Sequence, residues 1–187
     1  MTQRMRCDWG NTPNETYQTY HDQEWGKLNL NNQYLYEMLV LESFQSGLSW
    51  ETILNKRENF RQDFIDFDYH KVAKFTDKDF ATLMQDKGII RNRRKIEAAI
   101  NNAQALVKLE EEGSSFKDFL LQYISQPIIN HPHTMADVPA KSELSIQLSK
   151  AMKKIGFKFV GPVTIYSFLQ AVGLINDHVE ECYYKYK

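Results

Sequence analysis

One carboxylate of the sequence falls among apolar residues at helical spacing. Glu42 lies seven residues after Leu35, four after Met38 and three after Leu39, so one helix face carries all four side chains. A buried acid needs a partner, and an acid without one is a candidate for binding or catalysis. The pattern also fits a glutamate at the helix end that pairs with a nearby basic residue and reaches solvent.

Aromatic residues flank Glu42 along the chain, and all three tryptophans lie within the first 50 residues. Most aromatic rings belong to the core of a protein. Rings beside a carboxylate also make a pocket for a flat, positively charged group, because ring faces attract cations and the acid accepts hydrogen bonds from ring amines. The aromatic residues concerned are Trp9, Tyr17, Tyr20, Trp25 and Trp50.

Both cysteines and two of the five histidines form a possible metal-binding set. His178 and Cys182 are four residues apart, one turn of helix, and Cys7 and His21 lie near the other end of the chain. Two thiolates and two imidazoles suit a closed, tetrahedral, structural zinc site. The spacing alone favours free buried thiols and surface histidines, because it is not one of the compact zinc motifs. A disulfide is not expected in a reducing cytosol.

Two basic segments beside glycines are candidates for contact with phosphate groups. One covers residues 88–95 and the other covers residues 150–161. In the second, two expected helices flank a short turn between Gly156 and Gly161, so backbone N–H groups and a helix N-terminus could face one phosphate. The simpler interpretation is that these cations only form the solvated faces of helices.

The elements that must position these residues are mostly helices. Eight glycines and five prolines in 187 residues are few for a β fold with many tight turns. We expect an all-α, bundle-like fold and a single domain over residues 1–187. The apolar periods and capping residues predict helices at 33–44, 50–64, 93–111, 143–154 and 162–172. One further helix starts after Thr76 and stops near Gly88, and another starts after Ser115. The second of these stops before a long loop at 126–141.

Composition excludes several classes of protein. No run of 18 apolar residues is present, and the N-terminal segment lacks the apolar core of a signal peptide, so we expect a cytoplasmic protein without membrane contact. A formal net charge of −1 argues against a protein that coats nucleic acid by charge alone, but allows local basic patches. In the helix expected at 50–64, we expect Lys56, Arg57 and Glu58 on the exposed face.

Eight short stretches share their order and residues with one known family: Cys7–Trp9, Tyr20–Gly26, Leu41–Glu42, Gln45–Trp50, Lys56–Phe60, Gly88–Arg91, Gly156–Gly161 and Asn176–Val179. They resemble the DNA-3-methyladenine glycosylase I family, which belongs to the helix-hairpin-helix glycosylases. The likeness runs in order from Cys7 to about Cys182, nearly without gaps.

The resemblance implies a role for each matching residue. One structural zinc ion joins the N- and C-terminal segments and is bound by Cys7, His21, His178 and Cys182. The flipped base lies in a pocket of Glu42, Tyr20, Trp25 and Trp50, with Trp9 and Tyr17, and Glu42 is the catalytic residue. DNA is contacted by Arg91, Gly156, Lys158 and Gly161, while Gly47 and Leu48 face the gap left by the flipped nucleotide. We expect the zinc ion to lie away from the pocket.

The resemblance further implies a monomeric base-excision repair enzyme that hydrolyses the N-glycosidic bond of 3-methyladenine in alkylated double-stranded DNA and releases the free base. Methylation at N3 makes adenine cationic and a good leaving group, so the enzyme must flip the nucleotide, hold the base and admit water. No lysine is needed for a Schiff base, so we expect no lyase activity.

Two departures from the family pattern and two rival functions stand beside this interpretation. Phe44 and the 126–141 loop look divergent, and we expect Phe44 to reshape one pocket wall. The wider superfamily keeps a catalytic aspartate after the hairpin, but Asp177 directly precedes a proposed zinc ligand and is not assigned that role.

The rival functions are a DNA- or protein-binding module that zinc stabilises and that performs no chemistry, and a zinc hydrolase. Four protein ligands argue against the hydrolase, because catalytic zinc keeps an open position.

Overall fold

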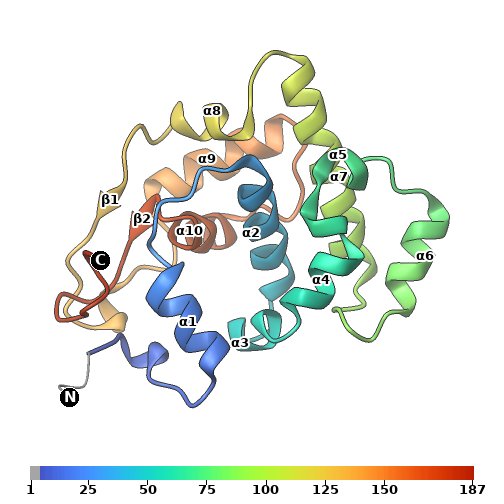
Figure 1. Ribbon diagram of the computed structural model, residues 1–187. Helices are drawn as coiled ribbons and strands as arrows, with labels where there is room; N and C mark the ends of the chain where they lie inside the picture. Colours follow the sequence, from blue (N-terminus) through green and yellow to red (C-terminus); the bar gives the residue numbers. More distant parts are fainter. Residues whose placement is uncertain (1–4) are drawn as a thin grey trace.

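The protein is built around one central helix, α2 (Asn32–Gln45), which other helices cover (Figure 1). Every side chain of residues 35–44 is buried. Four helices, α3 (Trp50–Leu54), α7 (Arg93–Glu111), α8 (Phe116–Leu121) and α10 (Pro162–Ala171), contact α2. A helix that is enclosed in this way is apolar on most sides, which explains why its sequence shows little amphipathic contrast.

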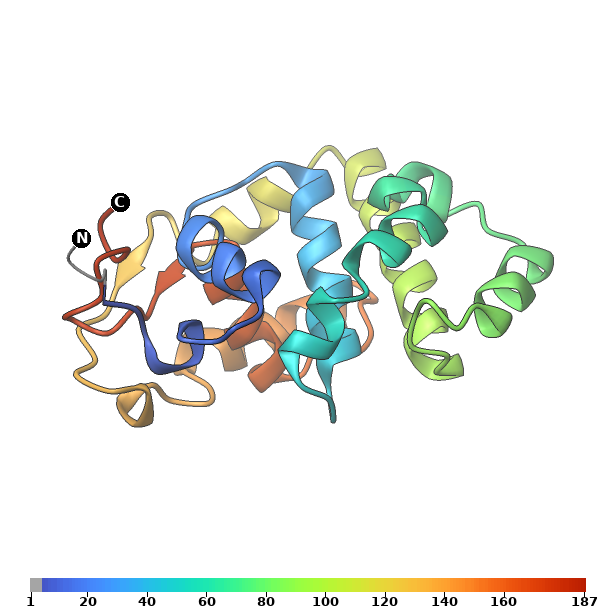
Figure 2. The same ribbon diagram turned by 60° about the horizontal axis from the view of Figure 1, so that its bottom comes forward.

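The computed structural model describes residues 5–187. The other helices are α1 (Glu15–Gln23), α4 (Arg57–Asp63), α5 (Tyr69–Val72), α6 (Asp77–Gln85) and α9 (Glu143–Lys154). Strands β1 (Ile128–Ile129) and β2 (Ile175–Asn176) pair in parallel, and 3-10 turns occupy Asp8–Gly10, Ile65–Phe67 and Met135–Asp137. Helices α4 to α7 form one end of the molecule, and the two strands lie towards the other (Figure 2).

Local capping explains where most helices begin. Ser49 accepts a hydrogen bond from the backbone of Thr52, and Thr76 and Ser115 each form a reciprocal capping box with the aspartate three residues later. The mostly helical class and the bounds of α7 and α9 confirm the prediction, and α10 ends one residue earlier than predicted. α6 ends at Gln85 rather than near Gly88.

Two predictions about helices were wrong. The helix expected at 50–64 is divided into α3 and α4 by a break at residues 55–56, and Arg57 is buried instead of exposed. His178 and Cys182 do not lie on a helix, because the chain turns after β2 and the Cys182 backbone N–H donates to Val179. This turn, not a helical repeat, places the two side chains on the same side of the chain.

The α9–α10 pair is joined by a turn that side chains of α7 and α9 hold in place. Gly156 has φ +96° and Phe159 has φ +55°, so the turn uses the left-handed region twice. Asn102 of α7 accepts from the Lys158 backbone N–H at 2.8 Å and donates to its carbonyl at 3.0 Å. Ser149 donates to the carbonyl of Val160 at 2.6 Å. These contacts fix the turn relative to α7 and α9.

No helix among residues 5–187 is long and apolar enough to cross a lipid bilayer.

Candidate functional site

The six predicted pocket residues line one cavity of about 290 Å³. Its ring-lined side is built from the N-terminal third of the chain: α1 supplies two tyrosines, α2 supplies the carboxylate, and α3 begins with a tryptophan. The rings pack on one another, with Trp9 and Trp25 edge to face at 5.0 Å between centroids. The residues of this side are Trp9, Tyr17, Tyr20, Trp25, Glu42 and Trp50.

Glu42 is the only acidic residue among those that line this cavity in the described part of the chain, and it is 6% exposed. No hydrogen bond or ion pair to its carboxylate occurs within residues 5–187. Burial raises the pKa of Glu42 to about 8, because the charged form loses its hydration. The expectation of a buried acid is therefore confirmed, and the alternative of a solvated, ion-paired glutamate is not.

Two more polar groups beside Glu42 are buried without partners. Within the described residues, the hydroxyl of Tyr20 and the indole nitrogen of Trp50 make no hydrogen bond. Burial and the nearby Glu42 raise the pKa of Tyr20 well above its usual value, so the phenol stays neutral. Buried polar groups are almost always satisfied in folded proteins. Three unsatisfied groups around one cavity indicate that a ligand supplies their partners.

The opposite side of the cavity comes from elements that sequence reasoning missed. The 126–141 loop contributes four small or apolar residues, and α10 contributes three polar ones. Periodicity gives no signal for a loop residue, and on α10 the polar residues face a buried cavity instead of solvent. The additional lining residues are Gln45, Met135, Val138, Pro139, Ala140, Val163, Tyr166, Ser167 and Gln170.

Phe44 does not line the cavity, so the expectation that it reshapes a pocket wall was wrong. Its ring is fully buried and packs against Phe60 at 4.8 Å between centroids and against Phe64 at 6.3 Å. Positions 42 and 44 are about 200° apart around a helix, so their side chains point in nearly opposite directions. The divergent loop, in contrast, does form part of the cavity wall.

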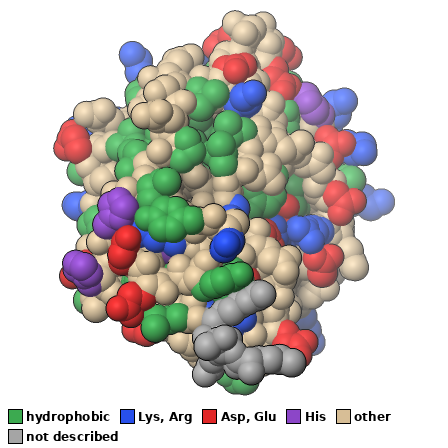
Figure 3. Space-filling model, turned by 60° about the vertical axis from the view of Figure 1, so that its left-hand side comes forward, with side chains coloured by type: hydrophobic (Ala, Val, Ile, Leu, Met, Phe, Trp, Pro, Cys, Tyr) green, Lys and Arg blue, Asp and Glu red, His purple; other side chains and the backbone are tan. Residues whose placement is uncertain are grey.

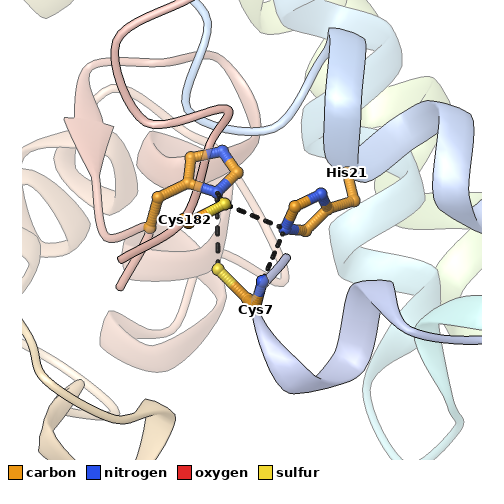
Figure 4. Close-up of side chains that lie close together, drawn as sticks. Cys7, His21 and Cys182 are labelled. Atoms are coloured by element: carbon orange, nitrogen blue, oxygen red, sulfur yellow. Dashed lines mark hydrogen bonds between the residues drawn. The ribbon is translucent and has the colours of Figure 1, made fainter. Parts of the chain in front are cut away.

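The four predicted metal ligands converge from both ends of the chain. Cys7, His21, His178 and Cys182 are all buried, and their ligand atoms lie within 4.8 Å of one another. Figure 4 shows the sulfur of Cys182 and the backbone N–H of Cys7 facing the ring of His21. The sulfur of Cys182 is 3.3 Å from His178 Nδ1 and 3.8 Å from His21 Nε2, and the sulfur of Cys7 is 3.4 Å from His178 Nδ1.

These separations fit a tetrahedral zinc site, in which bonds of about 2.0–2.3 Å place neighbouring ligand atoms about 3.3–3.8 Å apart. The far ring nitrogens are already held, because His21 Nδ1 contacts Asp22 Oδ1 at 2.8 Å and His178 Nε2 contacts the carbonyl of Trp25 at 3.0 Å. Such contacts select the tautomers that turn His21 Nε2 and His178 Nδ1 towards a metal.

The charge state of one thiol, Cys182, also suits a cation. Hydrogen bonds from Cys7 and the two imidazoles lower the pKa of Cys182 to about 2. The shared proton and burial raise the pKa of Cys7. Thiolates are the form of cysteine that binds metals. The ligand atoms, their spacing and the held histidines therefore fit a metal site.

The metal-ligand cluster adjoins the cavity, so the expectation that it lies away from the pocket was wrong. The ring of Trp9 contacts His21 at 4.7 Å between centroids, and the ring of Trp25 contacts His178 at 4.6 Å. Both tryptophans line the cavity. Gly10 permits this packing, because a Cβ there would lie 2.6 Å from the His21 ring. The aromatic side of the cavity thus rests directly on the ligand cluster.

The predicted DNA-contacting residues are accessible. Gly47 (φ +82°) and Leu48, which is 40% exposed, form the loop between α2 and α3. Arg91 and Lys158 are exposed, and a Cβ at Gly161 would meet no atom within 4 Å. All of these positions are therefore open to contact by a large ligand such as DNA.

Lys95 was included in the first basic segment, and that interpretation was wrong. Its side chain is buried, and its ammonium donates to the carbonyls of Phe44 and Ser46 at 2.8 and 2.6 Å. A cation at this position satisfies the free carbonyls at the C-terminus of α2. Lys95 therefore fixes the end of the helix that carries Glu42.

The face shown in Figure 3 has acidic and basic side chains interspersed, together with scattered hydrophobic side chains, and no continuous basic area. A phosphate-binding surface needs a local excess of cations. This face is therefore a poor candidate for DNA contact.

Aromatic faces beside a buried, unpaired carboxylate suit a flat ring with amine hydrogens or positive charge. The family model of the methyladenine glycosylases matches residues 9–186, and the chain belongs to this family. It is 47% identical over 178 residues to DNA-3-methyladenine glycosylase 1 of Escherichia coli (strain K12), covering 95% of each chain.

Solved structures agree with this assignment. A crystal structure of 3-methyladenine DNA glycosylase I superimposes with a TM-score of 0.93 at 44% identity, covering 96% of this chain and 98% of that one. A variant of a 3-methyladenine DNA glycosylase I in complex with 3-methyladenine gives a TM-score of 0.92 at 39% identity, covering 97% and 98%.

Proposed function

We propose that this protein is a DNA-3-methyladenine glycosylase, which hydrolyses the N-glycosidic bond of 3-methyladenine in alkylated double-stranded DNA. The observation that carries the proposal is the buried, unpaired carboxylate of Glu42 at a ring-lined cavity. A normal purine is neutral, whereas the N3-methylated nucleotide carries positive charge on its ring. A desolvated carboxylate among aromatic faces discriminates between the two.

The residues of the cavity then hold the base of a flipped nucleotide. The rings of Tyr20, Trp25 and Trp50 stack on the base, and Glu42 accepts a hydrogen bond from its exocyclic amine. The cationic base favours the charged form of Glu42, so binding displaces the proton that burial holds there. Water attacks the sugar as the glycosidic bond breaks and loses one proton to solvent, and the bonding electron pair neutralises the departing base.

The lining of the cavity supports hydrolysis without lyase chemistry. A lyase step needs an amine that forms a Schiff base with the sugar, and none of the described lining residues is a lysine. Glu42 is the one acidic group there and serves as the catalytic residue by selecting and holding the cationic base, whose own positive charge makes it a good leaving group.

DNA contact is assigned to two surface elements. The turn between α9 and α10, with Lys158 and the open backbone at Gly161, acts as the hairpin of a helix-hairpin-helix element that holds one phosphate. Arg91 supplies a second phosphate contact. Leu48, on the exposed loop after α2, fills the space left by the flipped nucleotide.

The metal-ligand cluster holds one zinc ion, which supplies a crosslink between the two ends of the chain and no chemistry at the base. The fit of the ligand spacing and the held histidines supports this assignment. Elemental analysis of protein purified without chelators should find about one zinc per chain, and protein without metal would contradict the assignment.

Incubation with methylated duplex DNA tests the activity directly. We expect release of free 3-methyladenine, detected by chromatography, and intact strands until alkali cleaves the abasic sites. Untreated duplex is the control. Binding to duplex without base release would instead identify a zinc-stapled DNA-binding module, and strand cleavage without alkali would contradict the monofunctional assignment.

A further inference from the structure

Asp177 is a buried carboxylate, 1% exposed, without a basic partner among the described residues. It accepts three hydrogen bonds from neutral groups instead. Tyr166 Oη and Gln170 Nε2 donate to its Oδ2 at 2.7 and 2.6 Å, and Asn130 Nδ2 donates to its Oδ1 at 2.7 Å. Three donors offset much of the cost of burying the charge, so Asp177 holds them tightly.

Two of the three donors line the base cavity. Tyr166 and Gln170 lie one turn apart on α10, and both belong to its polar wall. The third donor, Asn130, follows β1 and opens the loop that supplies the neighbouring wall at Met135–Ala140. One carboxylate therefore holds the two cavity walls that lie apart from the aromatic side.

These contacts decide which atoms α10 offers to a ligand. The single hydroxyl hydrogen of Tyr166 is used by Asp177, so its oxygen can only accept another hydrogen bond. The amide of Gln170 cannot turn over, because its oxygen would then face the carboxylate. Gln170 Oε1 consequently faces away from Asp177 and has no partner within residues 5–187.

We propose that Asp177 is a positioning residue that makes the α10 wall of the base cavity an acceptor surface, through Tyr166 and Gln170, and thereby favours bases that carry amine hydrogens. Together with Glu42, the wall then rejects rings that present a carbonyl at the same edge. The inference rests on the proposed function, which supplies 3-methyladenine as the ligand.

The competing explanation is that Asp177 only stabilises the local fold, as a brace between α10, β2 and the loop, and has no influence on specificity. A brace weakens the binding of every ligand alike. An orienting carboxylate changes the preference between an amine and a carbonyl on the same ring. The ratio of two affinities therefore separates the explanations.

The test compares 3-methyladenine with 3-methylhypoxanthine, which carries a carbonyl in place of the exocyclic amine. Dissociation constants are measured by quenching of the cavity tryptophans. We expect Asp177→Ala to lower the preference for 3-methyladenine about tenfold, the value of roughly one hydrogen bond, because the Gln170 amide becomes free to turn. The control Asn130→Ala removes the third donor and should leave the preference within about twofold, as both contacts to Oδ2 remain.

A second variant keeps the test valid if Asp177→Ala does not fold. The double variant Asp177→Asn, Asn130→Asp exchanges the two side chains and moves the charge to position 130. The amide nitrogen at position 177 then donates to the carboxylate at position 130, so the amide oxygen at position 177 still faces α10. We expect this double variant to retain the wild-type preference, and Gln170→Met to lose it. An unchanged ratio in Asp177→Ala or in Gln170→Met would overturn the inference. Wild-type protein that fails to bind 3-methyladenine would instead overturn the proposed function.

Discussion

Helix α2 carries two buried glutamates, Glu37 and Glu42, whose surroundings differ completely. Glu37 accepts from Arg57 Nε at 2.7 Å and from Arg61 Nε at 2.9 Å, and Arg57 also contacts Glu24 at 2.8 Å. Glu42 lies five residues later and has no partner in the described chain. Burial alone therefore does not identify a functional acid. The distinguishing feature of Glu42 is the missing partner beside a cavity.

The largest expected effect on stability comes from removing the main partner of Glu37. Arg57→Met leaves the carboxylates of Glu37 and Glu24 without their shared cation, and breaking a buried ion pair costs about 3–5 kcal/mol. We expect urea denaturation to show a loss of that size. Arg61→Met, at a more exposed pair, should lose no more than about 1 kcal/mol. Equal losses in the two variants would show that Arg57 is not the central partner.

Glu42→Gln should have the opposite profile, with intact folding and weaker base binding. The amide keeps the shape and one acceptor but removes the charge, and losing a charge-assisted hydrogen bond costs about 1.5–3 kcal/mol. Binding of 3-methyladenine should therefore weaken roughly ten- to a hundredfold, with slower excision. Titration calorimetry and single-turnover kinetics measure both. Wild-type affinity and rate in this variant would make Glu42 a structural acid like Glu37.

The stability of the unliganded protein should also depend on pH through Glu42. Its pKa is raised to about 8 in the folded state, so the folded protein binds the proton more tightly than the unfolded chain does. Glu42 therefore destabilises the fold progressively as pH rises from about 4.5 to about 8.

Glu42→Gln should remove this dependence. Relative to wild type, the variant gains stability progressively as pH rises from about 4.5 to about 8, and it gains nothing near pH 4, where the wild-type carboxyl is neutral like the amide. Thermal melts across this range give the difference. A constant offset between the two proteins would mean that Glu42 does not titrate with a raised pKa.

The smallest expected effect concerns an unpaired charge on the surface. Lys158 has no ion-pair partner within the described residues, but unlike Glu42 it is exposed, so folding should not change in Lys158→Glu. Duplex binding should weaken for all sequences alike, and the slope of log affinity against log salt should decrease by about one. Lys150→Glu on α9 is the matched control. An unchanged salt slope would show that Lys158 belongs to the solvated surface.

Local signals in the sequence predicted most helices and the burial of Glu42. The apolar periods gave the bounds of α7 and α9, and the structure adds side-chain caps at Asn92 and Ser142. Periods and caps depend only on residues within a few positions, which is why they can be read without the fold. The candidate metal ligands were predicted only through the family resemblance, because Cys7 and Cys182 meet only in the folded chain.

Charges with distant partners could not be predicted in the same way. Arg57 and Lys95 occur in polar stretches, and nothing near them reveals the carboxylates and helix end that bury them. The same holds for Asp177, whose donors come from α10 and the 126–141 loop. Such residues are decided by tertiary packing, which joins elements far apart in sequence.

The position of the metal ligands has a consequence for biosynthesis. Translation adds His178 and Cys182 after every residue that lines the cavity, yet the rings of Trp9 and Trp25 rest on the completed cluster. A nascent chain, or one cut short before Cys182, can form α2 but cannot close the cluster behind these rings. The aromatic side of the cavity therefore gains the cluster as its support only after Cys182 has been added.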